Sequence, residues 1–177
     1  MRNLKLFPFI FLLPAVLSAQ GAPMPETLSG RFAQTREIKQ AGVTLRSEGR
    51  FSIDKNKGIK WVTEKPLAST VTLSPGSAPV GGEAGRQVAA IMQGLLVQDR
   101  DALSKYFDVA HSKTKNGYET RLKATDATIA KVFSEIVITG DKYIRTVALS
   151  NLQGDATLIK FTDIRESAGD FPEDGQR

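Results

Sequence analysis

The chain has 177 residues, a formal net charge of +5, a single histidine and no cysteine. The lack of cysteine excludes disulfides, thiol nucleophiles, thiolate metal sites and lipid attachment through a thiol. The charge is small and its basic residues are mixed with acidic ones, which favours a solvated surface over a nucleic-acid partner.

Residues 1–21 are typical of a secretory signal peptide. Arg2 and Lys5 precede an apolar run from Leu6 to Leu17, and small residues follow it. The run is shorter than the roughly 20 apolar residues that span a membrane, so we expect cleavage rather than anchoring. Residues 22–177 then form a single exported domain, of a size that buries roughly 70% of its unfolded surface.

Four strands are predicted in the first half of the mature chain. Apolar and polar residues alternate over 31–38, 45–53 and 59–63, and a β-branched run covers 69–73. The residues at 54–58 are turn formers between the second and third of these strands. The first half therefore reads as antiparallel strands joined by short connections.

Helices are predicted in the middle of the chain, after a loop at 77–85 that is rich in Gly, Ser and Pro. Apolar residues fall at helical spacing over 87–96, and a second short helix containing Leu103 begins near Asp99 or Asp101. These are amphipathic helices that would cover a sheet.

Five further strands are predicted in the second half, at 106–110, 117–123, 135–139, 143–149 and 156–161. Asn116-Gly117 and Gly140-Asp141 are hairpin turn signals, 127–133 is a short helical turn, and the tail from Glu166 has a loose composition. About nine strands in meander order, with helices between the halves, predict an antiparallel sheet with helices on one side. Such a sheet twists strongly, so one of its faces should be concave.

An apolar strand face and a matching helix stripe are the main candidates for a site. The strand residues are Phe32, Phe51, Ile59, Trp61, Val71 and Leu73, and the helix residues are Ile91, Met92 and Leu95. Periodicity alone favours a filled core in which the two surfaces pack against each other. Spacing does not distinguish that core from a cavity for an apolar ligand.

Catalytic chemistry is not favoured. The only histidine, His111, is expected at the end of a strand beside Ser112 and Lys113, and nothing local suggests the partner carboxylate and nucleophile that catalysis would need in space. We interpret it as a solvated residue, and a hydrolase acting on an acyl ester through His111 is the enzyme alternative. No catalytic residue, metal site or cofactor is predicted.

Several short motifs resemble the periplasmic lipoprotein carrier family, LolA. They lie at residues 32–35, 49–51, 58–66, 103–109, 125–126, 136–140 and 154–161, and the resemblance covers most of the chain from Phe32 to Thr162. It implies an α+β, mainly β fold, in which a strongly curved antiparallel sheet forms an unclosed half-barrel with helices as a lid over an apolar cavity. It also implies that Ile59 and Trp61 face acyl chains inside that cavity.

The resemblance further implies a lid latch, formed in the family by an arginine six residues before the tryptophan. Lys55 stands at that position, and Asn56 replaces the proline that follows the arginine in the family. Any latch here would therefore use the ammonium group of a lysine and not the planar guanidinium group of an arginine. These departures indicate a divergent branch of the family.

The function implied is that of a monomeric periplasmic carrier. It would take a lipoprotein or other lipidated cargo from an inner-membrane donor complex and pass it to an outer-membrane acceptor. An alternative function, which is not transport, is that of a periplasmic sensing or protein-interaction module built on the same half-barrel.

Overall fold

The structure, a computed structural model, describes residues 27–54, 56–73 and 100–167. Nine strands and three short helices make up these ranges. The strands are β1 (Thr27–Ile38), β2 (Val43–Asp54), β3 (Gly58–Lys65), β4 (Ser69–Leu73), β5 (Phe107–Thr114), β6 (Gly117–Ala124), β7 (Glu135–Gly140), β8 (Ile144–Ser150) and β9 (Ala156–Ser167). The helices are η1 (Lys39–Ala41), α2 (Arg100–Ser104) and α3 (Ala127–Ala130). The predicted signal peptide lies outside the described residues.

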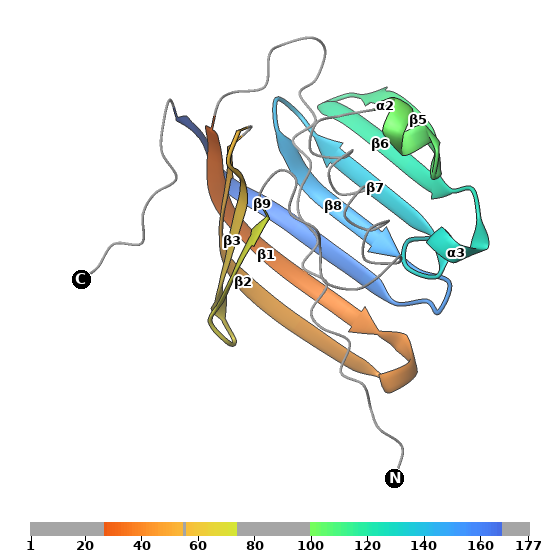
Figure 1. Ribbon diagram of the computed structural model, residues 1–177, viewed down its shortest axis with the longest axis horizontal. Coiled ribbons are helices and arrows are strands. Elements are labelled where there is room, and N and C mark those ends of the chain that lie inside the picture. The colour runs from red at the N-terminus through yellow and green to blue at the C-terminus, as the bar shows by residue number, and fades with distance from the viewer. Residues whose placement is uncertain (1–26, 55, 74–99, 168–177) are drawn as a thin grey trace.

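All nine strands form one antiparallel sheet in the order β4-β3-β2-β1-β9-β8-β7-β6-β5. The sheet consists of two meanders, β1 to β4 and β5 to β9, which join where the first strand pairs with the last. Figure 1 shows the sheet curling, with β3 and β4 turned steeply away from β5 to β8. Within the described residues, β4 and β5 pair on one side only, so the sheet is not closed into a barrel.

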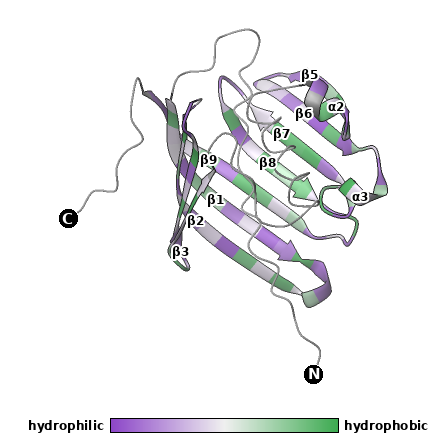
Figure 2. Cartoon of the chain, viewed as in Figure 1, coloured by the Kyte–Doolittle hydropathy of each residue, from purple (hydrophilic) through white to green (hydrophobic). Residues whose placement is uncertain are grey.

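The two faces of the sheet differ in polarity, because side chains alternate along each strand. Figure 2 shows this alternation of apolar and polar residues along the strands. One face, called the inner face below, holds the buried cluster that runs from Trp61 on β3 through Phe32 and Ile159 to Leu122 on β6. The opposite, outer face carries ion pairs, such as the one between Lys65 and Glu48.

The predicted helices that fall within the described residues are present but short. α2 brings Leu103 into the buried cluster and contacts β5. α3 begins where the Asp126 carboxylate accepts hydrogen bonds from the backbone N–H groups of Thr128 and Ile129, at 2.7 and 2.9 Å. No described helix is long and apolar enough to cross a membrane.

Two details of the sequence prediction are wrong. His111 lies within β5 and not at its end, because the strand continues to Thr114 opposite Gly117. The tail was expected to be loose from Glu166, whereas β9 continues to Ser167. The reason is that β1 begins at Thr27 and supplies partners to the last residues of β9.

The turn between β2 and β3 begins at Asp54. Its Oδ1 accepts hydrogen bonds from the backbone N–H groups of Lys57 and Asn56, both at 2.8 Å, and its Oδ2 accepts one from the Thr27 hydroxyl at 3.2 Å. The backbone bonds, chiefly that from Lys57, hold the pKa of Asp54 below its ordinary value. The charged carboxylate therefore contributes to the stability of this corner of the sheet.

Asp54→Asn is expected to make the free energy of unfolding depend less steeply on pH under acidic conditions. A carboxyl whose folded pKa is depressed contributes stability above its unfolded pKa of about 3.9, and this is lost as the pH falls through the folded pKa. Asparagine keeps an oxygen acceptor for the turn but does not titrate. We expect the free energy of unfolding, measured between pH 5 and pH 2, to fall less steeply in Asp54→Asn than in the wild type. Asp108→Asn on exposed β5 is the matched control, and identical slopes in all three proteins would contradict the role of Asp54.

Candidate functional site

The predicted strand residues come together on the inner face. The register pairs Phe51 with Trp61 and Trp61 with Val71, so these three side chains share one face across β2, β3 and β4. Ile59 lies two residues from Trp61 on β3, and Phe32 lies on the same face of β1. All except Val71 are almost fully buried. The apolar strand face predicted from the sequence is therefore a real surface of the sheet.

Trp61 lies at the centre of an aromatic cluster. Its indole stacks on the ring of Phe32 at a centroid distance of 3.8 Å, with Phe51 and Phe161 each 6.3 Å away. Phe161 meets Phe51 edge to face at 5.3 Å. Phe161 was not among the predicted site residues, although its strand was predicted. It joins the cluster only because β9 pairs with β1, and no local pattern indicated that pairing.

Gly49 makes room for this stack. It lies opposite Phe32 on β1 and opposite Thr63 on β3. A Cβ atom at Gly49 would lie 1.9 Å from the backbone oxygen of Val62 and 3.0 Å from the ring of Phe32. The close approach of β2 to β3 at this point thus depends on the missing side chain.

Three buried polar atoms around this cluster have no hydrogen-bond partner among the described residues. They are the indole Nε1 of Trp61, the hydroxyl of Thr63 and the side-chain oxygen of Gln34. All three residues belong to the inner face, Thr63 across from Gly49 and Gln34 two residues beyond Phe32. An unpaired buried polar group costs about 1–3 kcal/mol, so buried groups of this kind normally have a partner. Sequence reasoning missed this feature, because it arises from the placement of three strands.

The remaining predicted site residues are not placed. Ile91, Met92, Leu95 and the latch residue Lys55 lie outside the described residues, and the side chain of Leu73 is likewise outside the description. The backbone of Leu73 pairs with Ile59 at the edge of the sheet. The predicted contact between the helix stripe and the strand face therefore stays a prediction.

His111 faces two neighbours on β6. Its Nδ1 lies 2.8 Å from the Thr120 hydroxyl, and its ring stacks on Tyr118 at a centroid distance of 5.7 Å. The side chain is exposed, and within the described residues no carboxylate hydrogen-bonds to it. Burial, together with the charge of Asp141, raises the pKa of the Tyr118 hydroxyl above its ordinary value, so this phenol stays protonated. The geometry fits an anchored surface histidine.

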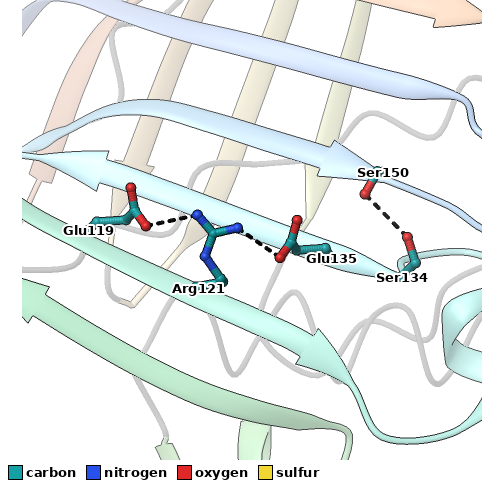
Figure 3. A network of polar contacts seen from close by, with 5 residues as sticks. All are labelled: Glu119, Arg121, Ser134, Glu135 and Ser150. Carbon is teal, nitrogen blue, oxygen red and sulfur yellow. Dashed lines mark hydrogen bonds and ion pairs between the residues drawn. The ribbon is translucent and has the colours of Figure 1, made fainter.

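Polar contacts join neighbouring strands on the outer face of the sheet, in the meander of β5 to β9. Figure 3 shows the guanidinium of Arg121 between Glu119 and Glu135, and the hydroxyls of Ser134 and Ser150 joined by a hydrogen bond. Arg121 lies 3.0 Å from Glu119 and 2.8 Å from Glu135, and the two serine hydroxyls are 3.2 Å apart. The hydrogen bond to Glu135, followed by that to Glu119, raises the pKa of Arg121, which stays charged. These contacts link β6, β7 and β8 across a solvated surface, and they mark the face that is not a candidate for an apolar ligand.

Comparison with known proteins gives distant structural neighbours. No family model matches the chain, and no curated protein matches it. Among solved structures it is similar to a domain described as an outer membrane lipoprotein-sorting protein from Vibrio parahaemolyticus, with a TM-score of 0.39, 12% identity, and coverage of 82% of this chain and 87% of that one.

Two other solved structures are similar at the same level. A LolA superfamily protein from Nitrosomonas europaea has a TM-score of 0.35 and 7% identity, covering 84% of this chain and 88% of that one. A DUF1329 family protein from Desulfovibrio piger has a TM-score of 0.33 and 8% identity, covering 83% and 88%. The Nitrosomonas europaea structure carries the name of the superfamily that the sequence motifs resemble.

Proposed function

We propose that this protein is a periplasmic carrier that binds the acyl chains of a lipidated cargo against its inner face and shuttles it from the inner towards the outer membrane. The observation that carries the proposal is the aromatic cluster of Phe32, Phe51 and Trp61 together with the unpartnered polar atoms of Gln34, Thr63 and Trp61. This combination suits an amphiphile. The motifs that resemble the LolA family support the same proposal.

Each part of such a ligand has a counterpart on the inner face. Hydrocarbon gains about 0.8 kcal/mol for every methylene group that leaves water, so a chain of a dozen carbons gains on the order of 10 kcal/mol before costs. The ester or amide that joins an acyl chain to its cargo presents a carbonyl oxygen. The Trp61 N–H and the Thr63 hydroxyl can donate to such an oxygen, which would relieve the cost of leaving them unpaired.

The proposal also includes a lid, for which the sequence is the support. The helix expected over 87–96, with Ile91, Met92 and Leu95, would cover the same apolar lining as the ligand does. The helix and the ligand would then compete for the same apolar surface. This competition would allow the carrier to release an acyl chain that it binds tightly. The Trp61 and Ile59 side chains are almost fully buried, so a ligand reaches them only if their cover moves.

The direct test is native mass spectrometry of the protein purified from periplasm, where bound acyl species are expected. The protein should also take up a fluorescent fatty-acid ester. Protein that is consistently empty and takes up no probe would contradict the carrier function. That outcome, together with an altered envelope stress response and normal lipoprotein localisation on gene deletion, would favour the sensing or interaction module.

Thr63→Val tests the polar part of the proposed site. Valine has nearly the same shape as threonine but lacks the unpartnered hydroxyl, so we expect an equal or higher free energy of unfolding. We also expect about five- to tenfold weaker binding of an ester-linked acyl probe, the effect of losing one hydrogen bond. Thr120→Val is the matched control, because Thr120 is equally buried on the inner face but its hydroxyl already pairs with His111. If Thr63→Val binds the probe as tightly as the wild type does, the Thr63 hydroxyl does not contribute to ligand binding.

A further inference from the structure

A hollow lies on the outer face of the sheet, opposite the aromatic cluster. It has a volume of about 280 Å³ and is open to solvent. Its lining comes from neighbouring strands, with Ser29 on β1 paired to both Ser52 on β2 and Arg165 on β9, and Ser52 paired in turn to Lys60 on β3. A hollow of this size is small for a drug-sized ligand and suits a compact chemical group.

The lining of this hollow is strongly cationic. Among the described residues, Arg31, Arg50, Lys60 and Arg165 line it, together with one carboxylate, Asp163. These residues come from β1, β2, β3 and β9, so the cations converge only in the folded sheet. Clustered like charges repel one another, so their convergence over a hollow is typical of a site for an anion.

Two of the arginines are held in place from the side. Glu64 on β3 accepts a hydrogen bond from Arg31 at 3.1 Å through Oε2, and it pairs with Arg50 at 2.7 Å through Oε1. One carboxylate thus fixes two guanidinium groups beside the hollow. A guanidinium that is already ordered loses less side-chain freedom when it binds an anion.

A buried hydroxyl without a partner lines the same hollow. Ser52 is 5% exposed, and its Oγ forms no hydrogen bond within residues 27–54, 56–73 and 100–167. Ser52 lies on the outer face, between Ser29 and Lys60, away from the apolar cluster. Since buried hydroxyls normally pair, this group indicates an acceptor that comes from outside the protein.

The backbone is irregular where β1 and β9 border the hollow. The register shifts between Ser29 and Arg31, and Asp163 on β9 has a φ of 52°. Such bulges change the direction of neighbouring side chains and are frequent at binding sites. Gly30 lies within this bulge, and the ring of Phe51 packs where its side chain would be, since an added Cβ would meet Phe51 Cε1 at 2.8 Å.

We propose that this outer-face hollow, which is lined by Arg31, Arg50, Arg165 and the unpartnered hydroxyl of Ser52, binds a phosphate monoester group. A phosphate monoester carries up to two negative charges and presents three acceptor oxygens. It can therefore accept from several guanidinium forks and a hydroxyl at once, whereas a carboxylate has one charge and two oxygens. The charged residues of this site lie on the face of the sheet opposite the proposed acyl site, and Phe51 borders both sites.

The phosphate can come from a soluble molecule or from a lipid headgroup, and the experiment has one arm for each. The first arm titrates the protein with glycerol 3-phosphate by calorimetry, with glycerate as the carboxylate comparator. The second arm measures co-sedimentation with phosphatidylcholine vesicles with and without phosphatidic acid. Binding in the first arm supports the site with a soluble ligand, and binding only to vesicles that contain phosphatidic acid supports it with a headgroup.

Variants separate a built site from general charge attraction. Arg165→Gln and Ser52→Ala should each weaken phosphate binding about tenfold, and Ser52→Ala should leave the unfolding midpoint unchanged or higher because it removes an unpaired buried group. Arg46→Gln is the matched control, since Arg46 is exposed on the same face of β2 outside the hollow. The proposal is overturned if neither probe binds, if glycerate binds as tightly as glycerol 3-phosphate, or if Arg46→Gln weakens binding as much as Arg165→Gln.

Discussion

Trp61→Ala is expected to lower the free energy of unfolding by about 3–5 kcal/mol, the range for truncating a large buried aromatic residue. Trp61 is 0% exposed, and it stacks on Phe32 while Phe51 and Phe161 surround it. Its removal leaves a cavity between β1, β3 and β9 that the strands cannot close without breaking their register. Denaturant unfolding followed by circular dichroism measures the loss.

Two further variants make the Trp61 experiment specific. Trp61→Phe keeps an aromatic ring and removes an indole N–H that has no partner in the described part of the chain, so its cost should be clearly below that of Trp61→Ala. Val62→Ala alters the next residue of β3, which points to the other face and is half-buried, and it should cost about 1 kcal/mol or less. If Trp61→Ala is no more harmful than Val62→Ala, the aromatic cluster is not the centre of the core.

Gly49→Ala is expected to cost about 3 kcal/mol or more in the free energy of unfolding, because one methyl group would separate two strands. The added Cβ would lie 1.9 Å from the backbone oxygen of Val62, so β2 and β3 must move apart. It would also press on the ring of Phe32, which stacks on Trp61. Thermal unfolding gives the stability, and near-ultraviolet circular dichroism reports the disturbed indole.

Gly42→Asn is the control for replacing a glycine. Gly42 has a φ of 63°, and a Cβ there would meet nothing within 4 Å. Asparagine tolerates this left-handed conformation better than other residues with a side chain, so the cost should stay below about 1 kcal/mol. Equal losses in Gly49→Ala and Gly42→Asn would mean that the contact with Val62 relaxes without harm to the sheet.

The strands themselves were largely predictable from local sequence. The alternation that predicted strands over 45–53 and 117–123 corresponds to β2 and β6, and the hairpin signal at Asn116-Gly117 marks the observed turn between β5 and β6. The apolar face with Phe51, Ile59 and Trp61 was also predicted, because a period of two places alternate side chains on one face. Such patterns depend on neighbouring residues, which the sequence displays directly.

The ends and neighbours of the strands were less predictable. Thr27 and Glu166 are strand residues only because β1 and β9 pair along their lengths, and neither residue lies in a clear alternating pattern of its own. The same pairing adds Phe161 to the aromatic cluster and Arg165 to the outer hollow. A partner far away in the chain leaves no trace in the local spacing of residues.

The sequence by itself determined the number of strands, most of their positions, and the apolar side chains that share the inner face. Only the tertiary structure decided that β9 pairs with β1, that cations from four strands converge on the hollow lined by Ser52, and that polar atoms of Trp61, Thr63 and Gln34 are buried without a partner among the described residues. The physical reason is that hydrophobic alternation is written along one strand, whereas hydrogen-bond satisfaction and charge clustering depend on which strands lie side by side.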